Sequence, residues 1–140
     1  MIYLKEIKIN PRYSETDQMG IIYHANYLVW FEVARTETLQ KYGINYKEME
    51  DQDIMLPVIE ANCKYKSSAK YGDEITIKTS IANMGASRVK FNYTVMKADR
   101  ILAEGFTEHA FMSAKKGRAI NLKKANEFLY NQLVDITKKQ

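Results

Sequence analysis

The sequence predicts an α+β fold in which a single five-stranded antiparallel sheet curls around one central helix. Three features predict it: a helical pattern near the N-terminus, four strand-like segments after it, and an amphipathic helical pattern at the end. The expected order of elements is therefore β, α, β, β, β, β, α. The 140 residues contain no internal repeat and no linker-like stretch, so we expect one domain over residues 1–140.

The first strand and the central helix come from the N-terminal third of the chain. Residues 4–13 alternate apolar and charged side chains, which predicts a half-buried strand. We expect the central helix to begin at Tyr27, with Asn26 as its N-cap, and to end at Gly43. Apolar side chains surround its first two turns almost completely, which predicts that other elements enclose this helix.

Four strands are predicted after the helix, at residues 55–65, 74–84, 88–97 and 101–113. The second and third alternate so regularly that they predict an antiparallel hairpin with one face on the helix. A sheet of five strands with one exposed face also suggests self-association. Asn121 is expected to cap a final helix. The apolar stripe of that helix consists of Leu122, Ala125, Phe128 or Leu129, Leu133 and Ile136.

Composition places the chain among ordinary globular proteins, because 46% of its residues are hydrophobic and 27% are charged. No apolar run approaches the ~20 residues that cross a bilayer, and residues 1–6 lack the order of a signal peptide. We therefore expect a cytoplasmic protein with no membrane partner. Twenty-one Lys and Arg against seventeen Asp and Glu give a net charge of +4. This charge is compatible with a phosphate-bearing small molecule and does not single out nucleic acid.

Some residues are expected to be structural. Cys63, the single cysteine, cannot form an internal disulfide and is expected to be a small core residue of a strand. His109 lies inside the last predicted strand, and Glu32 and Arg35 are spaced as an intrahelical pair. The sequence contains no metal-ligand cluster, phosphate-binding loop or dinucleotide fingerprint, so we expect no metal and no cofactor.

The most informative stretch is residues 16–35, which joins an acid, a glycine, a histidine and an apolar helix. Asp17 follows an extended segment, and Gly20 permits a tight backbone path before the helix begins. Free N–H groups and the positive end of the helix dipole collect at such a place and can hold a developing oxyanion. A carboxylate beside them can attack a carbonyl or take a proton from water. The alternative for Asp17 is a turn or cap carboxylate.

His24 lies seven residues after Asp17, next to the start of the helix. Histidine can transfer protons near neutral pH, so His24 is a candidate for orienting the substrate or the acid, or for moving a proton. The alternative is a histidine that makes only structural hydrogen bonds. Glu15 is expected to be a solvated strand end, while Tyr13 and Tyr23 could either donate hydrogen bonds at the site or simply pack.

Several runs of residues together carry a resemblance to a known family. They are Tyr13, Asp17-Gln18-Met19-Gly20, Tyr23-His24-Ala25-Asn26-Tyr27 and Phe31-Glu32-Val33-Ala34-Arg35. In this combination the chain resembles, over nearly its whole length, the hot-dog-fold acyl-CoA thioesterases of the 4-hydroxybenzoyl-CoA thioesterase type. Residues 65–73 and 84–87 are similar to the family's turn into its third strand and to the hairpin that follows. Ser67-Ser68 departs from the family, which usually has a proline there.

The resemblance implies hydrolysis of a thioester, with the family's essential aspartate at Asp17, its accompanying histidine at His24 and a site tyrosine at Tyr13. It implies a homodimer as the smallest unit, often paired into a homotetramer, with each pocket completed across the interface. The substrate would be an acyl-CoA, whose phosphates basic side chains would bind. The candidate substrate-binding residues are Tyr23, Asn26, Lys64, Lys66, Ser87, Arg88 and Lys90.

The predicted function is therefore an acyl-CoA thioesterase that uses Asp17 as nucleophile or general base and His24 as its partner. Backbone N–H groups at the start of the helix would stabilise the oxyanion. The alternatives are hydrolysis of thioesters on acyl carrier protein and a non-catalytic hot-dog domain that only binds acyl-CoA. A dehydratase on the same fold would want a different placement of acid and histidine. The presence of both residues argues against a pure binding domain, although fold alone does not establish chemistry.

Overall fold

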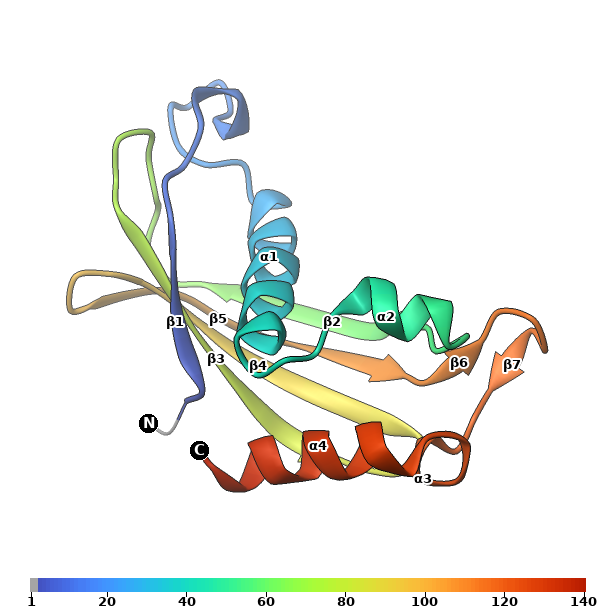
Figure 1. Cartoon of the computed structure of the whole chain (residues 1–140). Helices are drawn as coiled ribbons and strands as arrows, with labels where there is room; N and C mark the ends of the chain where they lie inside the picture. Colours follow the sequence, from blue (N-terminus) through green and yellow to red (C-terminus); the bar gives the residue numbers. More distant parts are fainter. Residues whose placement is uncertain (1–2) are drawn as a thin grey trace.

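The computed structural model describes residues 3–140 and contains a five-stranded antiparallel sheet with the strand order β1-β3-β4-β5-β2 (Figure 1). The strands are β1 (Lys5–Ile9), β2 (Val58–Tyr65), β3 (Ile75–Met84), β4 (Arg88–Lys97) and β5 (Arg100–Ala110). The long helix α1 (Asn26–Lys41) lies across one face of this sheet. The predicted α+β hot-dog architecture, in which four strands of this sheet follow the central helix, is confirmed.

The β3–β4 hairpin supplies much of the core. Ile75 and Ile77 of β3 are buried, while the residues between them are half-buried, and Ile77 lies opposite the buried Val95 of β4. Phe31 of α1 stacks on Tyr93 of β4 with ring centroids 4.3 Å apart. The apolar side chains of the hairpin therefore share the face of the sheet that α1 covers, as the alternation predicted.

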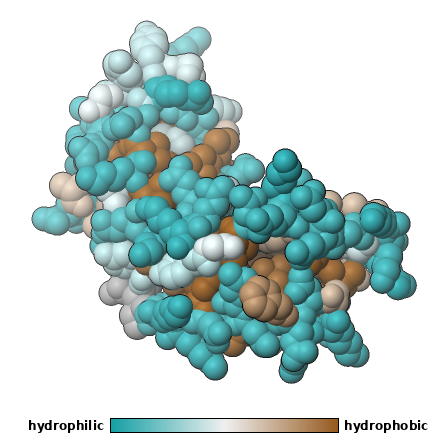
Figure 2. Space-filling view, in the orientation of Figure 1, coloured by the Kyte–Doolittle hydropathy of each residue, from teal (hydrophilic) through white to brown (hydrophobic). Residues whose placement is uncertain are grey.

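Only one side of α1 is covered. The buried apolar residues of the helix are Tyr27, Trp30, Phe31, Ala34 and Leu39. Leu28, Val29 and Val33 are exposed, Val29 to 49%, and Figure 2 shows apolar surface beside the upper part of α1. The prediction that other elements enclose the helix is wrong for a single chain, because one sheet covers one side of a helix.

The segment before α1 differs from the prediction at two points. β1 ends at Ile9, and Tyr13–Glu15 forms a 3-10 turn, because Pro11 lacks the N–H group that a continuing strand would use. The side chain of Asn26 does not cap α1, which begins at Asn26 with Ala25 in the N-cap position. Instead, its Nδ2 donates to the carbonyl oxygen of Glu15 at 2.9 Å and so ties the preceding turn to the helix.

A short helix, α2 (Tyr46–Asp51), follows α1 and was not predicted. Its six residues are mostly polar and only Met49 is buried, so it has too little apolar periodicity to be recognised. The last predicted strand is also divided: β5 ends at Ala110, and the short β6 (Met112–Ser113) pairs with β7 (Arg118–Ala119).

The C-terminal helix is interrupted at Asn126 and forms α3 (Leu122–Ala125) and α4 (Glu127–Lys138). Asn121 caps α3 as predicted, since its side chain accepts from the N–H of Lys124 at 3.1 Å. Of the two alternatives for the apolar stripe, Leu129 is buried and Phe128 is 80% exposed. No helix within residues 3–140 is long and apolar enough to cross a membrane.

Arg35 makes a different contact from the predicted pair with Glu32. Its side chain is buried on the sheet side of α1, where Nε donates to the hydroxyl of Tyr46 at 2.7 Å and Nη1 donates to the hydroxyl of Tyr93 at 3.3 Å. The spacing along the helix is compatible with a pair between Glu32 and Arg35. The Arg35 guanidinium is instead buried beside the hydroxyl groups of Tyr46 and Tyr93, which accept its hydrogen bonds.

A chain of hydrogen bonds continues from Tyr93 towards the start of β2. Tyr93 and Thr107 share a hydrogen bond of 2.6 Å, and Oγ1 of Thr107 lies 2.8 Å from Nε2 of the fully buried His109. Nδ1 of His109 lies 3.0 Å from the carbonyl oxygen of Leu56. Because a carbonyl only accepts, Nδ1 carries the proton, Nε2 accepts from Thr107, and Tyr93 donates to Thr107. Both ring nitrogens of His109 are thus used structurally.

The stability of the protein is expected to fall in mild acid because of His109. Burial, with the Arg35 guanidinium as a second cause, lowers the pKa of His109 to about 4. An unfolded chain binds this proton below about pH 6.5, so the free energy of unfolding declines as the pH falls from about 6.5 to about 4. Urea unfolding should show a loss of roughly 2 kcal/mol between about pH 7.5 and about pH 5. His109→Asn should remove most of this dependence, and an unchanged slope in that variant would contradict the assignment.

Candidate active site

Asp17 lies in a tight loop before α1. Its N–H donates to the carbonyl oxygen of Ile21 at 2.8 Å, and its Oδ1 accepts from the N–H groups of Met19 at 2.8 Å and Ile21 at 3.4 Å. Gly20 has a φ of +79°, which glycine adopts without strain. Within residues 3–140, Oδ2 of Asp17 has no hydrogen-bond partner. The carboxylate therefore shapes the turn with one oxygen and leaves the other available.

Asp17 and His24 line the same pocket, which has a volume of about 260 Å³. The pocket lies between the loop before α1, the first turn of α1 and the segment that follows β2. Its lining residues are Asp17, Met19, Ile21, Ile22, His24, Tyr27, Tyr65, Lys66, Ser67 and Ser68. The two residues on which the predicted chemistry depends are thus brought together beside the start of the central helix.

His24 is exposed, and its ring lies beside two aromatic rings. Its ring centroid lies 4.4 Å from that of Tyr23 and 6.1 Å from that of Tyr65. The hydroxyl of Tyr65 donates to the carbonyl oxygen of His24 at 2.9 Å. Burial is the largest of the effects that raise the pKa of Tyr65 to about 12, so this hydroxyl stays a donor at neutral pH. The contact fixes the backbone of His24 against β2.

The first N–H groups of α1 are already used. Those of Asn26, Tyr27 and Leu28 donate to carbonyl oxygens three residues earlier, at 3.0, 3.2 and 3.3 Å. Among the described residues, no hydrogen bond is formed by the N–H groups of His24 and Ala25, which immediately precede the helix. The predicted helix start at Tyr27 placed the free N–H donors in the first turn of the helix. The structure places them about one turn earlier, at His24 and Ala25.

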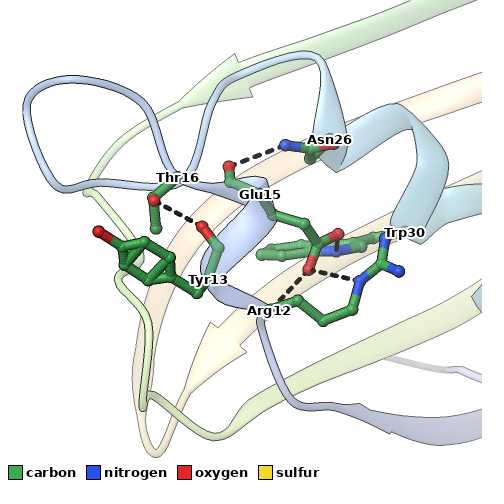
Figure 3. Close-up of polar contacts among 6 residues, drawn as sticks. All are labelled: Arg12, Tyr13, Glu15, Thr16, Asn26 and Trp30. Carbon is green, nitrogen blue, oxygen red and sulfur yellow. Dashed lines mark hydrogen bonds and ion pairs between the residues drawn. The ribbon is translucent and has the colours of Figure 1, made fainter.

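Other predicted site residues lie around the pocket without lining it. Tyr13 is 72% exposed and packs edge-on against the ring of Tyr71 at 5.8 Å. Tyr23 contacts His24, and Asn26 holds the turn before the loop (Figure 3). The roles given to these side chains stay predictions.

The prediction that Glu15 is a solvated strand end is wrong. Glu15 is buried, not solvated, and its Oε2 accepts from Nε1 of Trp30 at 3.0 Å (Figure 3). The sequence could not show this, because the position resembles the end of an alternating strand and its partner lies fifteen residues further on.

The basic residues proposed for coenzyme A are scattered over the sheet. Lys66 lines the pocket and lies 3.3 Å from Glu104. Lys64 lines a separate groove of about 640 Å³ formed by β2, β3, β4 and β5, and Lys90 lies over the ring of Phe106 at 4.1 Å. Of these basic residues, only Lys66 shares a cavity with Asp17.

Ser87 and Arg88 lie near the other end of the strands. Arg88 pairs in register with Ala110 of β5, whereas Tyr65 at the pocket pairs with Ala103. Seven residues of β-strand separate these positions, roughly 23 Å at about 3.3 Å per residue. Arg88 forms an ion pair with Glu108 at 3.3 Å, as Lys66 does with Glu104, so only position separates the two residues. Within one chain, Arg88 is therefore remote from the pocket.

Replacing Lys66 is expected to weaken substrate binding more than replacing Arg88. In Lys66→Ala the KM for an acyl-CoA should rise several-fold with little change in kcat, because a phosphate contact is made equally in the ground state and the transition state. The rise should shrink at high ionic strength, where screening already weakens the contact. Steady-state kinetics on both variants at two salt concentrations check this. A larger rise in KM for Arg88→Ala than for Lys66→Ala would indicate that the nucleotide binds at the far end of the sheet.

Several residues of the pocket had not been identified from the sequence as site residues. Tyr27 and Tyr65 form aromatic walls, with ring centroids 5.0 Å apart at nearly a right angle. Ser67 and Ser68 form part of the rim, and the only signal for them was the missing proline. Cys63 is half-buried, and burial raises the pKa of its thiol, which agrees with the expectation of an unreactive cysteine.

The fold and this pocket define a protein of the hot-dog thioesterase class, and comparison with known proteins agrees. The pattern of the thioesterase-like superfamily matches residues 11–133. YneP of Bacillus subtilis (strain 168), provisionally named as an acyl-CoA thioesterase, is 35% identical over 125 residues, which cover 89% of this chain and 91% of YneP. The chain therefore belongs to the thioesterase-like superfamily.

Two solved structures are also similar. The DHNA-CoA thioesterase from Staphylococcus aureus superposes with a TM-score of 0.92 at 32% identity. The superposition covers 99% of this chain and 93% of the Staphylococcus aureus chain. The hypothetical protein TT1821 from Thermus thermophilus has a TM-score of 0.88 at 31% identity, over 94% and 98% of the two chains. These findings confirm the hot-dog superfamily and the predicted class of enzyme, a thioester hydrolase. The 4-hydroxybenzoyl-CoA type and the cytoplasmic location stay predictions.

Proposed function

We propose that this protein is an acyl-CoA thioesterase whose active site is the pocket shared by Asp17 and His24. The observation that carries the proposal is the free Oδ2 of Asp17 in a pocket beside the start of α1, in a chain of the thioesterase-like superfamily. The names of the Staphylococcus aureus and Bacillus subtilis relatives support a coenzyme A thioester over one carried by acyl carrier protein.

Hydrolysis can follow two routes from this geometry. Oδ2 of Asp17 can attack the thioester carbonyl and expel the thiolate of coenzyme A, and water then hydrolyses the resulting anhydride. Alternatively, Asp17 takes a proton from water, whose oxygen attacks the carbonyl directly. Both routes consume one water and yield the free acid and coenzyme A. The N–H groups of His24 and Ala25, which form no hydrogen bond among the described residues, would donate to the oxyanion that both routes form. Neither route needs a metal or a further cofactor.

A panel of acyl-CoA thioesters with short, long and aromatic acyl groups tests the function, with release of free thiol as the readout. We expect catalytic hydrolysis of at least one member. The same acyl groups loaded on acyl carrier protein form the second arm, and faster turnover there would select the carrier-protein alternative. Tight binding of acyl-CoA without thiol release would select the non-catalytic alternative.

We further propose that the chain forms a homodimer, or a homotetramer built from dimers. β2 is an edge strand of the sheet, and all eight of its residues are exposed or half-buried. Exposed apolar side chains lie on this strand and on α1, which contacts it. They are Leu28, Val29, Val33, Val58 and Ile59. An unpaired edge beside an apolar helix face is suited to a second copy of the same surface.

Light scattering should give a mass of at least twice the 16.3 kDa of one chain at micromolar concentration. Val29→Lys should shift the protein towards the monomer, because it places a charge in the apolar surface of α1. Phe128→Lys is the matched control: Phe128 is also an exposed apolar side chain, but it lies on α4, which contacts β3. A monomeric wild-type protein with full activity would contradict the proposed assembly.

A further inference from the structure

Glu15 is a carboxylate with only 6% exposure at the end of the turn Tyr13–Glu15. Burial of a carboxylate is unfavourable unless hydrogen bonds and opposite charge compensate for it. Oε2 accepts from Nε1 of Trp30 at 3.0 Å. Oε1 accepts from the backbone N–H of Arg12 at 2.7 Å and lies 3.7 Å from the Arg12 guanidinium (Figure 3). Both carboxylate oxygens are occupied, so Glu15 is not itself a group that reacts with a substrate.

The backbone of Glu15 closes the loop of residues 16–25, which carries both candidate catalytic groups. Its carbonyl oxygen accepts from the N–H of Tyr23 at 2.8 Å and from Nδ2 of Asn26 at 2.9 Å. Glu15 lies directly before the loop, while Tyr23 and Asn26 lie at its end. The two ends of the loop therefore meet at one carbonyl oxygen.

The side chain of Glu15 attaches this closed loop to α1. Trp30 is one helical turn after Asn26 and is only 2% exposed, so its indole is fixed in the core. Its ring centroid lies 4.9 Å from that of Tyr27, which lines the pocket. A charge-assisted hydrogen bond to such a rigid donor sets the position of the loop relative to the helix.

We propose that Glu15 is a positioning residue, which holds the loop so that Asp17 and His24 face the pocket at the start of α1. The proposal rests on the thioesterase function proposed above. Displacement of a catalytic group by about 1 Å can cost about 10²-fold in rate. Half of the residues that line the pocket belong to this loop, but Lys66, the residue proposed to bind the phosphates, and the aromatic walls Tyr27 and Tyr65 lie outside it. Loss of this bond should therefore affect kcat more than KM.

Glu15→Gln tests the proposal, because it preserves the length of the side chain and removes its charge. We expect kcat to fall about 10-fold or more while KM changes less than about 2-fold. Trp30→Phe removes the indole donor and should lower kcat similarly. Glu15→Gln leaves one acceptor oxygen for the donors of Trp30 and Arg12, so both variants weaken the same attachment of the loop. The double variant should therefore lose less activity than the product of the two single losses. Multiplied losses in the double variant would overturn the proposal, because they would show independent structural effects.

A second measurement does not depend on activity. The N–H groups of Met19 and Ile21 bond Oδ1 of Asp17, so amide hydrogen exchange at these positions reports on the loop. Exchange should be faster in Glu15→Gln and unchanged in Glu74→Gln, an exposed acid paired with Lys8. If the wild-type protein hydrolyses no thioester, the proposed function fails, and exchange alone decides whether Glu15 orders the loop. Unchanged exchange in Glu15→Gln would overturn the positioning role.

The proposal stays testable if Glu15→Gln does not fold. Trp30→Phe retains the carboxylate and its contacts with Arg12, and it should still show the fall in kcat and the faster exchange at Met19. Equal kcat and equal exchange in a folded Trp30→Phe variant would overturn the proposal.

Discussion

Asp17→Asn is expected to lower kcat by about 10²-fold or more while the protein remains folded. The variant keeps Oδ1, which can still accept from the N–H groups of Met19 and Ile21 and preserve the turn. It replaces the free Oδ2 by an amide nitrogen, which neither attacks a carbonyl nor takes a proton from water. The substitution therefore separates the structural role of this side chain from its proposed catalytic role.

Thiol release at saturating acyl-CoA measures the effect, and circular dichroism with thermal unfolding verifies the fold. Asp99→Asn changes the net charge equally at an exposed turn between β4 and β5 and should retain wild-type activity. His24→Ala should lose less activity than Asp17→Asn, since its proposed role is orientation or proton transfer. Wild-type turnover in a folded Asp17→Asn variant would remove Asp17 from the mechanism.

Gly105→Ala is expected to destabilise the protein by more than about 3 kcal/mol or to prevent folding. Gly105 is on β5, directly beneath the ring of Phe31 of α1. A Cβ atom there would lie 2.2 Å from the carbonyl oxygen of Asn62 and 2.8 Å from Cε2 of Phe31. The Asn62 oxygen belongs to the paired backbone of β2 and cannot move without opening the ladder between β2 and β5.

Gly85→Ala is the matched control for this prediction. Its Cβ would come no closer than 3.5 Å to another atom, the carbonyl oxygen of Arg88, and its φ is not positive. Urea unfolding of the two variants should therefore differ by several kcal/mol. Equal stability of Gly105→Ala and the wild-type protein would mean that α1 does not pack on β5 as described.

The sheet was predictable from sequence because its strongest signals are local. Ile75 and Ile77 alternate with half-buried residues along β3, and buried residues alternate with more exposed ones over the first six residues of β4. A period of two over this length is produced by a strand with one face on a core. The single covered side of α1 was not predictable, since Val29 and Val33 are as apolar as the buried residues beside them.

Contacts between distant residues were the part that sequence could not show. Glu15 is buried because Trp30 and Arg12 provide hydrogen-bond donors, and Arg35 is buried because Tyr46 and Tyr93 accept from it. Charged residues are normally exposed, so the sequence at each of these two positions predicts an exposed side chain.

The candidate site was predictable only in part. Asp17 and His24 are seven residues apart in one loop, so local spacing brings them to the same pocket. The basic residues lie on different strands, and their distance from the pocket depends on strand register. Lys66 follows the end of β2 and reaches the pocket, whereas Arg88 pairs with the far end of β5.

The central claim is that an acyl-CoA reacts in the pocket of Asp17 and His24. A crystal structure with a non-hydrolysable acyl-CoA analogue, in which a methylene group replaces the thioester sulfur, tests it most directly. The account predicts the analogue's carbonyl carbon within about 3.5 Å of Oδ2 of Asp17 and its oxygen within hydrogen-bonding distance of the N–H groups of His24 or Ala25. An analogue whose carbonyl lies instead in the groove lined by Lys64, Lys78 and Glu104, which Asp17 does not line, would contradict it.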